Sequence, residues 1–288
     1  MNYYRFISKC IIALLFCIIG LTSCRDKIPT NEIHYTTIDN SVLPIKDLFF
    51  FGEGRIISNS YNPDKNVGIM KFNKDVTEIG KEAFYGCESL TSITIPESVT
   101  EIWEYAFSRC SSLTSITIPE SVGGIGGSTF SGCSSLTSIS VSKDNKVFDS
   151  REDCNAIIHT ESNTLISGCK NTTIPESVTM IGDDAFRGCS SLTSISIPES
   201  VTEIGKEAFY GCESLTSISI PSSVTEIGHR AFEGCSNLTS IDIPETVTEI
   251  GLGAFSRCSS LTSISIPESV TEIGYWAFFN SPKVRLLN

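Results

Sequence analysis

The sequence predicts a repeat solenoid: a β-rich, right-handed stack of about eight 23-residue coils with short helical or 3-10 turns, and with N- and C-terminal caps. The first observation is a unit, Ile-Gly-x-x-Ala-Phe, that recurs along the chain, with Trp103 in place of Gly in the second copy. The second is its spacing, because every interval is 23 residues except one of 56. Repeats of roughly 20 to 50 residues indicate solenoids and related arrays. The unit begins at Ile79, Ile102, Ile125, Ile181, Ile204, Ile227, Ile250 and Ile273.

Each coil contains one segment with the alternation of a half-buried strand. In an early coil, Leu90, Ile93 and Ile95 point inward, while the polar residues between them point outward. Pro96 suits the end of this strand because it has no amide donor. A second buried side follows, in which we expect the Ala-Phe pair to form the helical turn and the Gly after Ile to form the bend. Its apolar residues are Val99, Ile102, Ala106 and Phe107.

One coil cannot bury its apolar side alone, so neighbouring coils stack and share a continuous core. The Phe of each unit then forms a core column. Seven cysteines also recur in register, and we interpret them as a buried, reduced ladder, because free Cys packs as a small apolar residue. They are Cys87, Cys110, Cys133, Cys189, Cys212, Cys235 and Cys258.

The strand segment matches the L-x-x-L-x-L pattern of leucine-rich repeats. From about residue 33 to residue 288, the chain resembles the BspA-like leucine-rich repeat class of bacterial surface lipoproteins. This resemblance implies adhesion to host proteins or to other cells, whereas the periodicity by itself indicates only the architecture.

The first 23 residues have the features of an export signal. Arg5 and Lys9 precede an apolar run of about ten residues, which is too short to span a bilayer. Leu21-Thr22-Ser23-Cys24 resembles a lipobox, which implies cleavage before Cys24 and lipidation of Cys24. Ordinary cleavage that leaves a free thiol is the alternative. We expect residues 24–32 to form a tether and the protein to be anchored in the outer membrane, at the cell surface rather than in the periplasm.

Charge restricts the partners of the mature chain. Removal of residues 1–23 changes the formal charge from -12 to -14. An acidic surface of this kind argues against nucleic acid, because phosphate binding needs Lys and Arg. It also argues against anionic lipid headgroups, so membrane contact is expected through the lipid alone.

Both ends of the solenoid require caps. Residues 33–65 are predicted to form the N-terminal cap, and residues 66–288 the solenoid, with its first coil near residue 66. At the other end, Trp276 and Phe279 are expected to form an apolar lid, and Val284 and Leu287 align with Leu261 and Ile264 in a last strand.

The long interval contains an insert at residues 142–173. Ala156–His159 and Thr164–Ser167 read as a hairpin. Cys154 and Cys169 are candidates for a disulfide across it, which would be structural in an oxidising compartment. The acidic residues of the insert lack the spacing of a calcium loop, so no metal site is predicted.

The positions around Ala-Phe vary among the coils, and this edge is the candidate site for ligand contact. Exposed aromatic side chains are common in binding hot spots, while drift on a solvated edge is the alternative. The candidate residues are Tyr85, Trp103, Tyr105, Tyr210, His229 and Arg230.

Catalytic and cofactor motifs are absent from the sequence. It has no G-x-S-x-G, no H-E-x-x-H and no Gly-rich phosphate loop. We therefore predict a non-enzymatic, monomeric protein without cofactors that presents an extended repeat surface to protein or glycan ligands. The alternatives are an envelope scaffold without an external ligand, and a carboxylate hydrolase in the insert near Asp149–His159.

Overall fold

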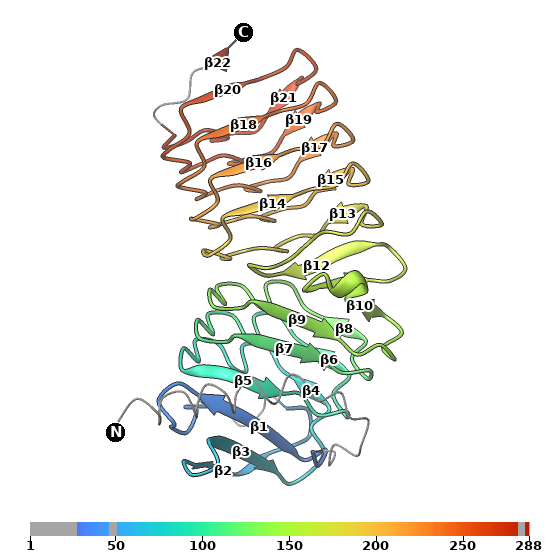
Figure 1. The fold of residues 1–288 in the computed structure, drawn as a ribbon, viewed down its shortest axis with the longest axis vertical. Helices are drawn as coiled ribbons and strands as arrows, with labels where there is room; N and C mark the ends of the chain where they lie inside the picture. Colours follow the sequence, from blue (N-terminus) through green and yellow to red (C-terminus); the bar gives the residue numbers. More distant parts are fainter. Residues whose placement is uncertain (1–27, 46–50, 282–285, 288) are drawn as a thin grey trace, which may run out of the picture.

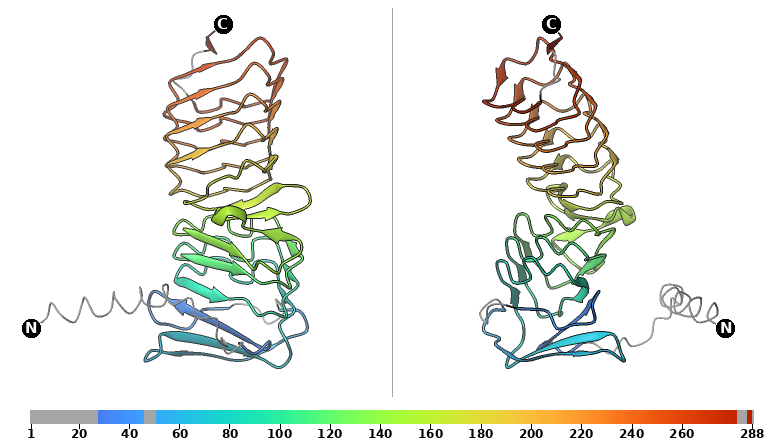
Figure 2. Two further views of the ribbon diagram at one scale, coloured as in Figure 1. Left: turned by 45° about the vertical axis from the view of Figure 1, so that its right-hand side comes forward. Right: turned by 90° about the vertical axis from the view of Figure 1, so that its left-hand side faces the viewer.

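The computed structural model describes residues 28–45, 51–281 and 286–287. The chain forms an elongated stack of coils, with the described residues from 28 onward at one end of the long axis and residues 286–287 at the other (Figure 1). Two further views show that the stack is continuous in outline and changes direction slightly near its middle (Figure 2). We number coils 1 to 8 by their Ile-Gly-x-x-Ala-Phe units, from Ile79 to Ile273. The predicted repeat solenoid is confirmed.

The N-terminal end is an antiparallel sheet rather than a first regular coil. Its strand order is β2 (Ile56–Asn62), β3 (Val67–Phe72), β1 (Glu32–Thr37) and β5 (Leu90–Thr94). The expectation that stacking begins near residue 66 is therefore corrected. β1 lies between β3 and β5, so β5 is the first of the repeat strands. β1 satisfies the backbone groups of β5 that would otherwise form an open sheet edge.

One face of the stack is made of the predicted strands. Most of them pair in parallel with the strand of the next coil, as in Ile218↔Ile241, within one two-stranded and one five-stranded sheet. Their inward Ile side chains are largely buried and their Ser and Thr side chains point outward. The strands after β5 are β7 (Ser115–Ile118), β9 (Ser138–Val141), β14 (Ser194–Ser196), β16 (Ser217–Ser219), β18 (Ser240–Asp242), β20 (Ser263–Ser265) and β22 (Leu286–Leu287).

Short parallel strands run along another face, in one sheet before the insert and another that continues from it; together we call them the second sheet, and the sequence analysis missed it. Its two-residue strands are the pairs that end at the Ile of each unit, such as Glu203 and Ile204. Because they are so short, no alternation can reveal them in the sequence. They are β4 (Glu78–Ile79), β6 (Glu101–Ile102), β8 (Gly124–Ile125), β13 (Met180–Ile181), β15 (Glu203–Ile204), β17 (Glu226–Ile227), β19 (Glu249–Ile250) and β21 (Glu272–Ile273).

The Ala-Phe segment forms consecutive turns, not the expected helical turn. In coil 1, the amides of Ala83, Tyr85 and Cys87 each donate to a carbonyl three residues earlier, at every second residue. The only helix in the described part of the chain is η1 (Arg151–Asp153). Glu82 interrupts a helical path with φ 62°, and its amide instead donates to Glu104 O of the next coil at 3.2 Å. Bonds between coils therefore replace bonds within a helix.

The glycine after Ile has a different role from the predicted one. Gly205, Gly228 and Gly251 have no left-handed φ; that conformation falls two residues later, for example at Glu207 with φ 56°. A Cβ on Gly228 would lie 2.6 Å from the carbonyl carbon of Gly205 in the preceding coil. The glycine is therefore required because adjacent backbones approach closely.

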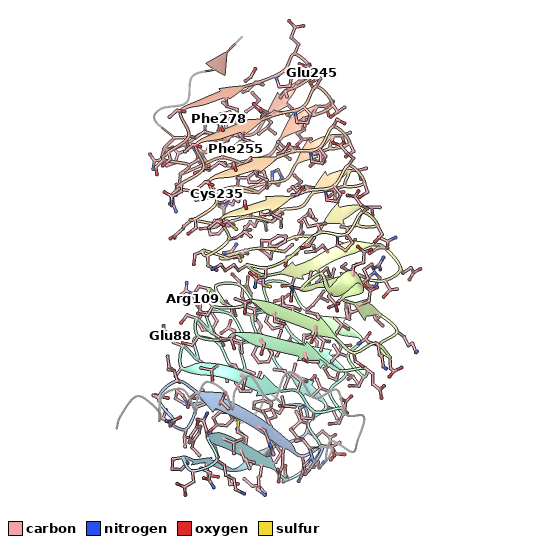
Figure 3. All side chains as sticks on the ribbon, in the orientation of Figure 1. Glu88, Arg109, Cys235, Glu245, Phe255 and Phe278 are labelled. Carbon is pink, nitrogen blue, oxygen red and sulfur yellow. The ribbon has the colours of Figure 1, made fainter. Side chains whose placement is uncertain are left out.

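Phe and Cys form the two predicted core columns. Phe186, Phe209, Phe232, Phe255 and Phe278 stack with centroid separations of 5.1 to 5.7 Å and nearly parallel rings. The thiol of Cys235 donates to Phe209 O of the preceding coil at 3.3 Å. Figure 3 shows Cys235, Phe255 and Phe278 within the stack. Ser281 replaces Cys in coil 8 and makes the same bond, to Phe255 O at 2.8 Å.

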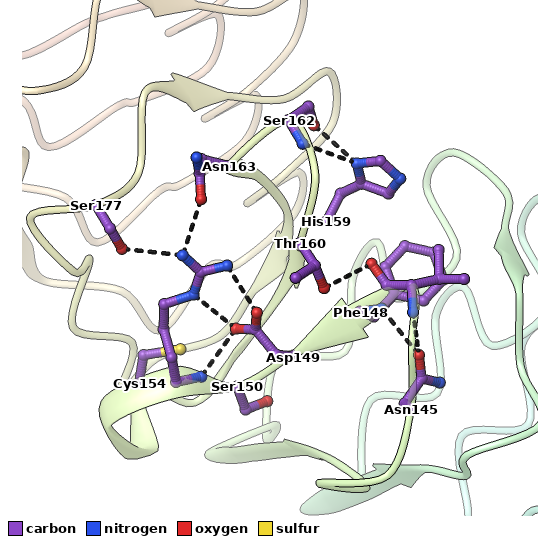
Figure 4. Close-up of polar contacts among 12 residues, drawn as sticks. Asn145, Phe148, Asp149, Ser150, Cys154, His159, Thr160, Ser162, Asn163 and Ser177 are labelled. Atoms are coloured by element: carbon purple, nitrogen blue, oxygen red, sulfur yellow. Dashed lines mark hydrogen bonds and ion pairs between the residues drawn. The ribbon is translucent and has the colours of Figure 1, made fainter.

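The insert contains the predicted hairpin. β11 (Ala156–His159) pairs antiparallel with β12 (Thr164–Gly168), and β10 (Phe148–Asp149) adds a third strand. β12 then pairs in parallel with β13, so the insert acts as an enlarged coil. Arg151 binds Asp149 through two nitrogens at 2.8 and 2.6 Å and also reaches Asn163 and Ser177 (Figure 4).

The insert also divides the interior of the stack. Buried side chains form one core from Ile33 to Cys169 and a second from Cys154 to Ala277, with the insert contributing to both. The Phe186 ring packs against Gly168 of β12, where a Cβ would come within 2.2 Å of the ring. The expectation of one unbroken interior is therefore corrected to two consecutive cores.

The C-terminal coil differs from the expected lid. Trp276 is 67% exposed and Phe279 is 52% exposed, so neither covers the core among the described residues. In the last strand, Leu286 rather than Leu287 pairs with Ile264. Val284 lies outside the described residues.

Candidate ligand-binding edge

The candidate site is the turn edge, defined as the two residues between Ile-Gly and Ala-Phe together with the two residues after Phe in every coil. These residues lie in the chain of turns described above. Their side chains project from one side of the stack, where Arg109 is seen in Figure 3, and Glu245 projects from the opposite side. Trp103, which replaces the preceding Gly, lies beside this edge.

In coils 1 and 2 the turn edge carries aromatic rings paired with cations. The Arg109 guanidinium lies 5.5 Å from the Tyr85 ring centroid, and the Lys81 ammonium lies 5.9 Å from that of Tyr105. Trp103 is 49% exposed, and its indole N–H donates to Glu78 at 2.9 Å. Three candidate residues, Tyr85, Trp103 and Tyr105, thus lie on adjacent coils.

In coils 4 to 7 the turn edge carries a ladder of alternating charges. The Arg187 guanidinium stacks over Tyr210 at 4.4 Å and contacts Glu207. Along the stack, the ladder continues with looser contacts of 3.5 to 3.7 Å. Its order is Asp184, Arg187, Glu207, Arg230, Glu233 and Arg257.

The other candidates, Tyr210, His229 and Arg230, lie in coils 5 and 6. The His229 ring is oriented along the stack. His229 Nδ1 accepts a hydrogen bond from the Leu252 amide of the next coil at 2.9 Å. Arg230 remains about half exposed within the charge ladder. The structure therefore separates the predicted residues into two groups, one in coils 1–2 and one in coils 5–6. Coils 3 and 4 lie between them, and their turn edges contact each other through the Gly132 amide and Arg187 O at 3.2 Å.

A groove in coil 7 was missed by the sequence analysis. Its floor holds Gly253 and Ser256, in columns where coils 5, 6 and 8 carry larger side chains. The groove encloses about 320 Å³. In the sequence, the groove is indicated by small residues at turn-edge positions where neighbouring coils carry aromatic residues. This pattern can be seen only once the coils are aligned. Arg230, Glu233, Leu252, Arg257, Trp276 and Phe279 complete its lining.

The cysteines do not form a nucleophilic site. Burial raises the pKa of Cys133, Cys189 and Cys258 to about 12, and those of Cys212 and Cys235 are raised in the same direction. A thiol with a raised pKa is protonated at neutral pH and reacts slowly.

Cys154 and Cys169 are buried free thiols in the structure. They belong to different cores, and each Sγ lies near a backbone carbonyl, that of Ala156 and of Asn155 respectively. A disulfide between them is not formed here and stays a prediction for the exported protein.

The described ranges contain neither a metal-type cluster nor a helix that could span a membrane. No group of three or more His, Cys, Asp or Glu side chains there has the arrangement of a metal site. No helix there has the length and apolar character needed to cross a bilayer. The predicted signal, Cys24 and the first residues of the tether lie outside the described residues.

The family comparison matches most of the solenoid. The BspA type leucine rich repeat region matches residues 54–159 and 157–285, in six copies. The chain belongs to this family. The match includes the insert, whose strand β12 continues the second sheet. Among curated proteins there is no match.

Solved structures support the same fold. A leucine rich cell surface protein from Faecalibacterium prausnitzii is 36% identical with a TM-score of 0.63, over 73% of this chain and 56% of that one. The pneumococcal vaccine antigen PcpA is 23% identical with a TM-score of 0.60, over 73% and 55%. A leucine-rich repeat protein from Eubacterium ventriosum is 22% identical with a TM-score of 0.53, over 75% and 77%. The chain spans about half the length of the first two.

Proposed function

We propose that this chain is a non-enzymatic cell-surface binding protein whose turn edge contacts protein or glycan ligands. One observation carries the proposal: the core columns repeat almost unchanged, while the turn edge varies among the coils, apart from the identical coils 1 and 5, and holds exposed aromatic and Arg side chains. Such side chains are enriched in binding hot spots. The similar protein from Faecalibacterium prausnitzii is a cell surface protein, which supports the location.

The stacked architecture suits large ligands. Strands of neighbouring coils lie about 4.8 Å apart, so the two groups of candidate residues lie along one extended edge. Contacts at both groups by one ligand, or by neighbouring copies of it, would add through effective concentration. Weak individual contacts are then sufficient for useful binding.

The test removes the aromatic side chains without disturbing the coil. In the variant Tyr85→Ser, Trp103→Gly, Tyr105→Ser and Tyr210→Ser, each new residue already occupies the same column in another coil. We expect at least a tenfold loss of binding to immobilised matrix proteins and to intact cells. Glu199→Gln with Glu245→Gln, on the opposite side of the stack, is the control. Unchanged binding by the aromatic variant would favour the scaffold alternative.

Anchoring at Cys24 is a separate part of the proposal. Several acyl chains hold a protein stably at a membrane, whereas one chain does so only marginally. We expect Cys24→Ser to move the protein from the membrane fraction to the soluble fraction. Protease treatment of intact cells then distinguishes the outer surface from the periplasm. Membrane retention of Cys24→Ser would refute lipidation as the anchor.

A further inference from the structure

The groove in coil 7 combines an apolar wall with two Arg side chains whose contacts among the described residues are loose ion pairs. The apolar wall consists of Trp276 and Phe279 of coil 8, which are both more than half exposed. The opposite side carries Arg230, and Arg257 lies at the end of the coil. The groove exists because Gly253 and Ser256 leave space between these walls.

The two guanidiniums are only loosely neutralised. Glu233 lies between them, 3.5 Å from Arg230 Nε and 3.7 Å from Arg257 Nη1. Both distances exceed the roughly 2.7–3.2 Å of an N–H···O hydrogen bond. Glu207, 3.7 Å from Arg230, makes a much closer contact with Arg187. The lining of the groove is thus net positive in a chain with a formal net charge of -12.

The backbone of the groove offers little to an extended peptide. The amides of Gly253 and Arg257 donate to Tyr275 O and Phe279 O of coil 8, and the Ser256 amide donates to Gly253 O. Peptides that bind as an added strand require free backbone groups at a sheet edge. Recognition here would therefore depend on side chains alone.

From this geometry we infer that the groove binds an acidic sugar residue of a glycan, with the sugar ring against Trp276 and the sugar carboxylate on Arg257 and Arg230. A guanidinium recognises a carboxylate through a planar pair of N–H donors. The volume of about 320 Å³ is at the lower end of the roughly 300–1,000 Å³ typical of ligand sites. The inference rests on the proposed binding function and specifies its ligand class.

Matched saccharides test the role of the carboxylate. The probes are 3′-sialyllactose with lactose as its neutral counterpart, and a hyaluronan tetrasaccharide with chitotetraose as its neutral counterpart. We expect at least one acidic probe to bind ten times more tightly than its neutral partner, by calorimetry at low salt. The pair that shows the difference distinguishes a sialic acid from a uronic acid. Equal affinities within both pairs, or no binding of any probe, would overturn the inference.

Variants of the full chain test the location. Arg257→Gln should weaken acidic binding at least tenfold, whereas Lys146→Gln, at an exposed cation of the insert outside the turn edge, should have no effect. Ser256→Tyr should abolish binding by filling the groove with the residue that coil 5 carries at Tyr210. Thermal unfolding confirms that each variant is folded. Acidic binding that survives both Arg257→Gln and Ser256→Tyr would place the site elsewhere and refute the inference.

Two further arms separate this inference from the proposed function. An Asp-rich peptide should not compete with the acidic saccharide, and full competition would show that the groove recognises acidic peptides instead. Failure of the saccharide tests with retained cell binding refutes the acidic-sugar inference alone. If cell binding is lost neither in the groove variants nor in the aromatic variant, the proposed function itself is refuted.

Discussion

At the residue scale, the cysteine column shows how one side chain can serve packing and hydrogen bonding together. Cys212 and Cys258 each donate to a Phe carbonyl of the preceding coil at 3.2 Å. Each of these carbonyls also accepts the Cys amide of its own coil, as from Cys189 N–H to Phe186 O at 3.0 Å, so the thiol supplies a second hydrogen bond. Ser281 satisfies the same acceptor, so the requirement at this position is a small donor.

These thiols should be unreactive in the folded protein. Burial raises the pKa of Cys189 to about 12, so at pH 8 the thiolate is scarce and shielded from reagent. We expect a chain that begins after Cys24 to show almost no reaction with Ellman's reagent until denaturant is added. Nine reactive thiols after denaturation would mean that Cys154 and Cys169 are free, and seven would mean that they are bonded. Rapid labelling of the folded chain would contradict the buried column.

At the element scale, the second sheet places glutamates of adjacent coils directly beside one another. Glu203 pairs with Glu226, and Glu226 pairs with Glu249. Like charges directly opposite each other in a sheet are destabilising. Burial, together with the charges of Glu226 and Asp183, raises the pKa of Glu203 above its usual value.

The sign of the resulting pH dependence can be tested. A raised pKa in the folded state means that the charged form of Glu203 opposes folding at neutral pH, and that this cost disappears as pH falls through the folded pKa. We expect Glu203→Gln to raise the free energy of unfolding at pH 7 by about 0.5 kcal/mol, with no gain at pH 3. Urea unfolding at both pH values measures this, with the isolated Glu161→Gln as control. A loss of stability at pH 7 would be the contrary result.

The insert is a second element whose stability can be predicted. Arg151 joins Asp149, Asn163 and Ser177, which come from three separate segments (Figure 4). Charge-assisted bonds of this kind contribute about 1.5–3 kcal/mol in favourable cases, and partial exposure reduces the value here. We expect Arg151→Ala to destabilise the chain by about 1–2 kcal/mol and Arg151→Lys by nearly as much, because Lys cannot form the planar pair. A neutral effect of Arg151→Ala would show that the insert is held by its apolar residues alone.

Sequence reasoning at these two scales succeeded where a physical requirement repeats. The strand residues Leu90 and Ile93, the Phe column and the hairpin of the insert could be predicted, because each has a distinct pattern of apolar or turn residues. The two-residue strands could not, because their partners are set by the stack and not by local alternation. The groove at Gly253 depends on what neighbouring coils carry, so it too is a property of the assembly.

At the scale of the whole molecule, the structure consists of two consecutive stacks joined by the insert. The first strand face is interrupted between β9 and β14, and the described rings include no stacked pair of Phe130 with Phe186. In repeat proteins, stability is carried by the interfaces between neighbouring repeats. At the insert, the interface between coils 3 and 4 lacks, among the described residues, the strand pairing and the Phe stacking that join the other coils of each stack.

This division predicts local rather than global effects of core mutations. Phe209→Ala should cost about 3–5 kcal/mol within the C-terminal stack. Hydrogen exchange should then become faster in coils 4 to 8, while coils 1 to 3 keep their protection. Phe107→Ala should give the reverse pattern. A uniform loss of protection in either variant would show that the two stacks unfold as one unit.

Along each stack, residues 23 positions apart lie directly above one another. Thr179 and Thr271 are exposed positions four coils apart in the second stack. Both residues are replaced by Cys and spin-labelled. Pulsed electron–electron double resonance should then give a distance of about 20 Å between the labels, from four steps of roughly 4.8 Å. A distance well beyond that, or a distribution without a defined maximum, would contradict the stacked arrangement.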